Sequence, residues 1–367
     1  MKTKILSWLA AIALVFAFAF TACDNGGGGN QGNQGNQNGN QAGYDGTPGL
    51  AFELINGGRA ARDANGNAYR VRKGDVTDGH VKIPAYYNGL PVTEIGFIMD
   101  DEGNTAFGRT DITSIEIPET IAIIGGWAFS GCINLTSITI PASVTEIGDN
   151  PFNVCNDLKN ITVAADNKIY SSEDGILYNK NKTELVAFPS VRGEFIIPDS
   201  VTSILGGALA QTYLTNVTIP ARVTKIGIIV FYNCYSLESI SVDPDNPNYS
   251  SENGILYNKA KTEIIQVPGA ISDDITIPNS VTTIGDMAFL QCHNLTSVII
   301  PNSVTTISEG AFTLWASSQT INVQGHSTQA DADAAWGEKW RKERLSWKED
   351  WTDIRAIIKY WDGNSYQ

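Results

Sequence analysis

A 23-residue unit recurs along this chain, and it constrains the fold more than any other feature of the sequence. Its pattern is L-x-x-I-x-I-P-x-x-V-x-x-I-x-x-x-A-F-x-x-C-x-x. The positions written L, I, V and F in this pattern hold apolar residues. Four copies align without gaps, at residues 112–134, 135–157, 214–236 and 295–317. A long pattern that returns at a fixed period indicates a solenoid of stacked repeats.

Each repeat predicts two short strands and one tight turn. The I-x-I segment favours a first strand, which the following proline ends because it has no N–H to donate. The V-x-x-I segment favours a second short strand, and A-F-x-x-C fits a short helical or 3-10 turn. One repeat buries too few side chains to offset the entropy of ordering 23 residues, so the units must stack. We therefore expect a mainly β repeat solenoid.

Two longer units interrupt the regular period. Seven I-P turns follow the standard pattern, with prolines at positions 84, 118, 141, 198, 220, 278 and 301. The units at 158–213 and 237–294 instead carry two closely similar 19-residue segments, SSEDGILYNKNKTELVAFP (171–189) and SSENGILYNKAKTEIIQVP (250–268). Each segment reads as strand, Asn/Lys/Thr turn and strand, which predicts a hairpin insertion. Such hairpins would offer protruding edges to a partner.

Both open ends of a solenoid need a cover. Residues 51–56 and 67–73 predict a β-hairpin within an N-terminal cap at 44–80, ahead of an array at 81–323. The C-terminal cap at 324–367 begins with Thr328-x-x-Asp331, which resembles a capping box. It predicts a helix to about Arg344, then a loop and a strand at 356–361. The repeat itself departs from its pattern near residue 92, eight positions after Pro84.

Four tryptophans in this cap are spaced for one face of a helix: Trp336, Trp340, Trp347 and Trp351. On a continuous helix they would lie within about 60° of one another. Such a stripe fits a membrane surface or a carbohydrate, or else a face that packs on the last repeat. We favour packing, because the array needs a lid there.

The N-terminus has the features of an export signal. Lys2 and Lys4 precede 16 residues without charge, and residues 20–23 read Phe-Thr-Ala-Cys. This stretch is short for a membrane span and predicts a signal peptide at 1–22. Residues 24–43 are a Gly/Asn/Gln tract, which predicts a flexible tether with a reach of about 25 Å.

The repeat and the N-terminus together resemble a known family. The 23-residue pattern, over residues 81–323, is similar to the BspA-like class of bacterial leucine-rich repeats, also called the Treponema pallidum type. The resemblance implies a right-handed, curved solenoid with a parallel sheet on one face, and a role in adhesion or protein contacts. It carries no catalytic residues. Phe-Thr-Ala-Cys resembles a relaxed bacterial lipobox, which implies lipidation of Cys23 and anchoring at the outer membrane or cell surface. Asp24 leaves the final leaflet open.

Charge and side-chain inventory argue against several functions. The net charge is −14, or −16 without residues 1–22, so nucleic acid is not an expected partner. His80, His293 and His326 lack metal-ligand spacing, and no phosphate-binding loop occurs. We expect no cofactor, no metal and no enzyme activity. An envelope scaffold is the alternative to a binding protein, and a carbohydrate-acting enzyme is a more distant one.

Two further motifs have ordinary structural interpretations. Cys132, Cys155, Cys234 and Cys292 share one repeat position, where Thr110, Thr212 and Trp315 also occur. This interchange favours inert buried thiols, with a Cys132–Cys155 disulfide as the alternative. Residues 243–247, Asp-Pro-Asp-Asn-Pro, resemble a sparse calcium loop, but a Pro/Asn turn explains them.

The positions beside the first strand give the candidate ligand face. They are polar in successive repeats, so stacking would line them into ladders that suit a protein or a glycan. The alternative is plain β-propensity on a solvated face. The candidate residues are Thr113, Glu116, Thr136, Thr139, Lys159, Thr162, Thr215, Thr218, Glu238 and Thr296. We expect a monomeric body whose partner is a host matrix protein, another bacterial surface protein or a glycan.

Overall fold

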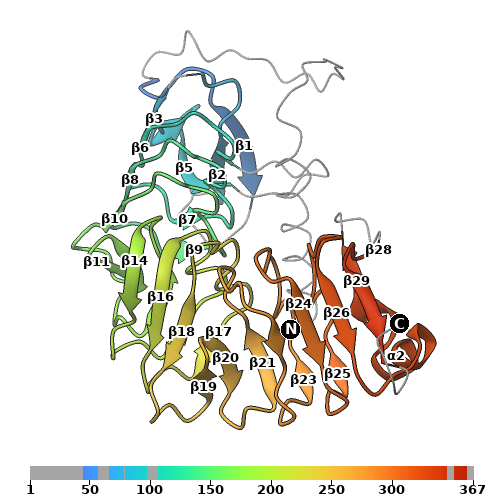
Figure 1. The fold of residues 1–367 in the computed structure, drawn as a ribbon. Helices are drawn as coiled ribbons and strands as arrows, with labels where there is room; N and C mark the ends of the chain where they lie inside the picture. Colours follow the sequence, from blue (N-terminus) through green and yellow to red (C-terminus); the bar gives the residue numbers. More distant parts are fainter. Residues whose placement is uncertain (1–43, 57–65, 78, 97–105, 345–350, 362–367) are drawn as a thin grey trace.

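The chain forms a curved β-solenoid of about 11 turns. The computed structural model describes residues 44–56, 66–77, 79–96, 106–344 and 351–361. The array runs down from its N-terminal strands and then across to the C-terminal cap (Figure 1). The predicted repeat solenoid is therefore confirmed. The predicted signal peptide and tether lie outside the described residues.

First strands of successive turns pair in parallel, and we call their outer side the first-strand face. The pairing follows the 23-residue register, for example Ile138 beside Ile161. These strands fall into four short rows: β3 (His80–Lys82) with β6 (Ser114–Glu116); β8 (Ser137–Ile140) with β10 (Asn160–Val163); β14 (Arg192–Ile196), β16 (Tyr213–Ile219) and β18 (Ser239–Val242); β22 (Ile275–Thr276), β24 (Ser297–Ile300), β26 (Thr320–Val323) and β29 (Ile357–Tyr360).

Strand β8 shows why the repeat folds this way. Ile138 and Ile140 are buried while Ser137 and Thr139 are exposed, as the alternation of a half-buried strand requires. Pro141 follows at once and ends the strand. Val144 then turns inward with no exposed surface, next to the second strand. The apolar letters of the pattern are thus the inward positions of every turn.

Second strands form rows of their own on another side of each turn. The first row joins β1 (Ala51–Asn56), β2 (Asn67–Arg72), β5 (Leu90–Ile95), β7 (Ile123–Ile124) and β9 (Glu146–Ile147). The antiparallel pair β1–β2 is the predicted cap hairpin. A small hairpin of β4 (Tyr86–Tyr87) and β5 turns at Asn88-Gly89, which have φ of 50° and 79°. That inserted turn explains the irregular spacing after Pro84.

The A-F-x-x-C segment is a pair of hydrogen-bonded turns. Ser130 N–H donates to Trp127 O (2.9 Å) and Cys132 N–H donates to Phe129 O (3.1 Å), which are 3-10-type bonds. Trp127 (φ 59°) and Gly131 (φ 81°) are left-handed, so no helix propagates. Phe129 N–H also donates to Pro151 O of the next turn, at 2.9 Å. This segment therefore adds a third ladder between turns.

The two predicted hairpin insertions are three-stranded and form the seams of the array. β11 (Tyr170–Glu173), β12 (Ile176–Asn179) and β13 (Glu184–Ala187) pair antiparallel, and β13 continues in parallel with β15 (Ser203–Ile204) and β17 (Lys225–Ile226). The second seam repeats this with β19 (Tyr249–Glu252), β20 (Ile255–Asn258), β21 (Glu263–Gln266), β23 (Thr283–Ile284) and β25 (Thr306–Ile307).

The expectation that these hairpins protrude is wrong. Ile176, Leu177 and Tyr178 are buried, as are Leu185 and Ala187, because the inserted strands belong to the core. Their exposed residues are those of the turns and the last residues of the outer strands, Glu173 and Glu252. Each seam also ends one row of second strands, and a tyrosine hydroxyl takes the place of the next strand. Ile147 N–H donates to Tyr170 Oη at 2.9 Å.

The C-terminal cap differs from its predicted form in the length of its helix. α2 (Gln329–Trp336) begins at Thr328, whose side chain accepts from Asp331 N–H at 3.2 Å. The helix ends at Trp336, eight residues before Arg344, and is followed by Gly337 with φ 79°, so the expected longer helix is wrong. The 3-10 helix η1 (Glu338–Arg341) and strands β27 (Lys342–Arg344) and β28 (Trp351–Asp353) follow, and β29 pairs with β26.

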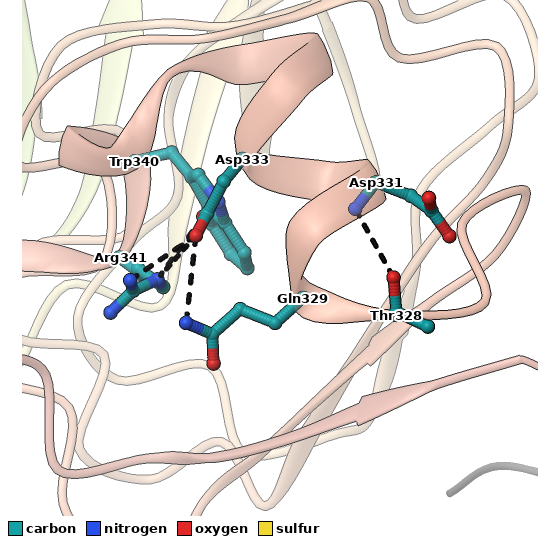
Figure 2. A network of polar contacts seen from close by, with 6 residues as sticks. All are labelled: Thr328, Gln329, Asp331, Asp333, Trp340 and Arg341. Carbon is teal, nitrogen blue, oxygen red and sulfur yellow. Dashed lines mark hydrogen bonds and ion pairs between the residues drawn. The ribbon is translucent and has the colours of Figure 1, made fainter.

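The cap packs on the last repeat through its tryptophans. Trp336 Nε1 donates to Val304 O at 3.1 Å, and Trp340 is 1% exposed. Trp340 Nε1 and Arg341 Nε both donate to Asp333 Oδ1, at 3.0 Å and 3.1 Å. Figure 2 shows the three side chains together. Because α2 ends at Trp336, the tryptophans do not share one helix. Trp347 lies outside the described residues.

Candidate functional site

The first-strand face carries the candidate ligand residues. Thr139 lies beside Thr162 in the parallel register of β8 and β10, and Lys82 lies beside Glu116 in β3 and β6. Eight candidates are exposed: Thr113, Glu116, Thr136, Thr139, Lys159, Thr162, Glu238 and Thr296. Thr215 and Thr218 are partly buried. The candidates therefore share one side of the solenoid.

Several of these side chains also tie one turn to the next. Thr113 Oγ1 donates to Gly79 O at 3.0 Å, Thr215 Oγ1 donates to Gly193 O at 3.2 Å, and Thr296 Oγ1 bonds the Asp274 carboxylate. Glu116 lies 3.2 Å from His80 Nε2. Thr139 makes no side-chain hydrogen bond among the described residues. Its hydroxyl is thus available to a ligand, whereas the bonded hydroxyls are partly occupied.

The seams divide this face into separate patches. β10 pairs with β8 but not with β14, and Ile161 N–H instead donates to Gly175 O in the β11–β12 turn, at 3.0 Å. The same break follows β18, where Ile240 N–H donates to Gly254 O at 2.9 Å. The structure brings Glu116, Thr139 and Thr162 into neighbouring turns. It separates them from Thr215, Thr218 and Glu238.

Sequence reasoning missed an exposed apolar side chain on this face. Ile196 is 72% exposed and lies beside Thr218, which lies beside Ser241. Residues 195–198 read Phe-Ile-Ile-Pro, so isoleucine occupies a repeat position that carries threonine in residues 135–157. A comparison of that column between repeats would have identified it.

The cysteine column is buried and hydrogen-bonded. Cys132, Cys155, Cys234 and Cys292 are free thiols, so the alternative of a Cys132–Cys155 disulfide is wrong. Cys132 Sγ donates to Phe107 O at 3.1 Å and Cys234 Sγ donates to Leu209 O at 3.1 Å. Trp315 Nε1 makes the same kind of bond, to Phe289 O at 2.9 Å. The column therefore holds donors that bond the carbonyl one turn earlier.

The histidines and the acidic loop have structural surroundings. Burial lowers the pKa of His293, which stacks on Tyr235, and His326 packs edge-on against Trp336. Asp243 accepts from Asp245 N–H at 2.8 Å, as a Pro/Asn turn predicts. Within the described residues, no group of three or more His, Cys, Asp or Glu side chains is arranged to hold a metal ion.

Six copies of one family model match the repeats, within three successive ranges. The model of the BspA type leucine-rich-repeat region matches residues 102–193, 193–273 and 269–338. The chain belongs to the BspA-type leucine-rich-repeat family. Such repeat proteins are in general surface modules for protein interaction and adhesion. A comparison with curated proteins gives no match.

Solved structures of bacterial repeat proteins resemble this chain. A leucine-rich cell surface protein from Faecalibacterium prausnitzii is 29% identical, with 71% of this chain and 62% of that one covered and a TM-score of 0.47. A leucine-rich repeat protein from Eubacterium ventriosum is 25% identical, with 75% and 66% covered and a TM-score of 0.45. The pneumococcal vaccine antigen PcpA is 15% identical, with 85% and 97% covered and a TM-score of 0.42. The chain thus spans less than two thirds of the first two proteins.

The described part of this chain contains no helix of the length and apolarity that a membrane crossing requires.

Proposed function

We propose that this protein is a lipid-anchored envelope protein that binds a protein or glycan partner through its first-strand face. The observation that carries the proposal is the alignment of Glu116, Thr139 and Thr162 as exposed side chains of neighbouring turns. Neighbouring strands lie about 4.8 Å apart, so the aligned residues present polar groups at a regular spacing.

The composition of this face favours hydrogen bonding over charge pairing. Thr136, Thr139 and Thr162 are exposed hydroxyl side chains on rigid backbone, and each can donate and accept. Rigid polar groups lose little entropy on binding, and protein interfaces contain about one hydrogen bond per 100–200 Å². The patch of the first-strand face that carries Thr136, Thr139 and Thr162 therefore suits a partner rich in carbonyl, amide or hydroxyl groups.

The N-terminal sequence supports presentation of that face to the exterior. A lipidated Cys23 would anchor the chain, and the tract 24–43 would separate the folded body from the lipid by about 25 Å. This arrangement places a repeat array where a large partner can reach it. An envelope scaffold without an external partner is the competing role, and protease treatment of intact cells distinguishes the two. Shielding of the protein until the outer membrane is opened would contradict the adhesion role.

The decisive experiment captures partners with a chain that spans residues 44–367 and then compares two triple variants of it. Thr136, Thr139 and Thr162 are replaced by lysine in the first variant. The matched control carries lysine in place of Thr145, Thr282 and Thr305, which are exposed beside the second strands. We expect the first variant to weaken binding at least about tenfold, and the control to bind normally. Equal binding by both variants would remove the site from the first-strand face.

A further inference from the structure

A cavity of about 620 Å³ lies at the second seam, on the side of the second strands. One part of its wall comes from the segment after β17, before the seam, and includes Ile228 and Val230. Another part comes from the segment after β23, beyond the seam, and includes Met287 and Leu290. Ile265 of β21 also lines it. Cavities between about 300 and 1,000 Å³ are typical of small-molecule sites. These residues form an apolar wall, in which Ile228 is 38% exposed.

The apolar lining is a local departure from the repeat. The residues that precede the phenylalanine of the repeat read Ile228-Ile229-Val230 here, and Asp149-Asn150-Pro151 at the first seam. Met287 and Leu290 correspond to Gly207 and Ala210 there. The Asn150 carboxamide occupies the space beside Gly207, 2.9 Å from where a Cβ would stand. The fold thus does not require this apolar wall, since the equivalent seam is built without it.

Three carboxylates line the same cavity: Glu263, Asp286 and Glu309. Burial and the nearby Asp286 raise the pKa of Glu263. Among the residues that the structure describes, no cation lies within ion-pair distance of Glu263 or Asp286. Only Glu263 has an acidic counterpart at the first seam, where Glu184 accepts a hydrogen bond from Asn179 at 3.3 Å. The second seam therefore combines an apolar wall with two carboxylates, Glu263 and Asp286, that no described residue pairs with.

We propose that this seam pocket binds a small organic ligand with an apolar body and a cationic nitrogen. The apolar body would cover Ile228, Ile265 and Met287, and the nitrogen would approach Glu263 and Asp286. A cation there would offset the repulsion between the two carboxylates. The pocket is lined from the second strands, so this site is separate from the first-strand face and does not depend on the proposed adhesion function.

Calorimetric titration of the full chain with three matched probes tests the proposal. Phenylbutylamine, phenylbutanol and phenylbutyrate share one apolar body and differ in the charge of the end group. We expect the amine to bind about tenfold more tightly than the alcohol, and the acid to bind most weakly. Absence of amine binding, or amine binding no tighter than that of the alcohol, would overturn the proposal.

Variants at the two seams locate the site. Glu263→Gln should weaken amine binding about fivefold and leave alcohol binding unchanged. Glu184→Gln, its counterpart at the first seam, should change neither. Met287→Gly should weaken both probes; glycine suits the φ of 56° at this position and already stands at the equivalent Gly207. Two results would place the ligand elsewhere and overturn the proposal. The first is an equal loss of amine binding in Glu184→Gln and Glu263→Gln, and the second is unchanged amine binding in Met287→Gly.

Discussion

Asn167 Nδ2 donates a hydrogen bond of 2.8 Å to the carbonyl oxygen of Pro141, which lies one turn earlier. It donates a second bond to Val144 O at 3.0 Å, and its Oδ1 accepts from the N–H groups of Ile169 and Tyr170, both at 2.8 Å. The side chain has no exposed surface. One carboxamide thus satisfies four backbone groups where the first insertion leaves the regular turn, and Asn246 repeats the arrangement at the second seam.

We predict that Asn167→Ala lowers the free energy of unfolding by about 2–4 kcal/mol, because it leaves buried backbone groups without partners. Urea unfolding followed by circular dichroism measures the change. The neighbouring Asp166 is exposed, so Asp166→Ala should stay within about 0.5 kcal/mol of the parent. Equal stabilities for the two variants would mean that the carboxamide does not hold the seam.

The buried thiols should resist chemical modification in the folded protein. All four thiols are buried, so a reagent cannot reach them in the folded protein, and burial also raises the pKa of Cys234 and of Cys292. In a Cys23→Ala background, we predict no labelling by a maleimide until denaturant is added, and then four labels per chain. Mass spectrometry counts them. Two labels after unfolding would reveal a disulfide and contradict the free-thiol structure.

The repeat predicted the stacking because every turn encodes it locally. Ile138 and Ile140 alternate with Ser137 and Thr139, so strand, inward face and exposed face follow from one segment. The arrangement of the strands at the two seams could not be predicted from the repeat in the same way. Whether β13 protrudes or continues a row depends on its pairing with β15, and two chain segments decide that contact together. Sequence periodicity alone carries no information about such a pairing.

The site was only partly predictable for the same reason. The exposure of Thr139 follows from alternation, but the cavity exists because Ile228 and Met287, from different turns, meet at one seam. The C-terminal helix is shorter than the sequence predicts because Gly337 directly follows Trp336. A glycine at φ 79° and ψ 147° ends a helix whatever periodicity follows it.

The stability of the C-terminal cap should depend on the ionisation of Asp333. Partial burial acts to raise its pKa, but hydrogen bonds from Arg341 and Trp340 outweigh burial and hold the pKa below the usual value. A depressed pKa in the folded state stabilises the fold above the ordinary pKa of about 4, and this contribution disappears as the pH falls through the folded-state pKa. We predict that the parent loses cap stability in that acidic range.

Replacement of Asp333 separates this contribution from general acid unfolding. Asp333→Asn should lower stability by about 1–2 kcal/mol at pH 7 and should flatten the acidic decline, because no carboxylate remains to titrate. Thermal unfolding between about pH 7 and pH 3 measures both effects. Asp166→Asn provides the control, since this exposed side chain makes no hydrogen bond or ion pair among the described residues. A decline of the same steepness in Asp333→Asn and the parent would assign the pH dependence to other groups.

Membrane attachment should depend on one side chain, that of Cys23. Acylation at this position would supply two or three hydrocarbon chains, and one chain alone holds a protein only weakly and reversibly. We predict that the parent partitions into the detergent phase of a Triton X-114 extraction, whereas Cys23→Ala enters the aqueous phase. Cys132→Ala is the matched control, because it removes a buried thiol of the body and leaves residues 20–23 intact. Mass spectrometry of the mature N-terminus should show acyl groups on the parent only. If Cys23→Ala remained in the detergent phase, attachment would have to come from an uncleaved hydrophobic segment at residues 5–20, and the lipobox interpretation would fail.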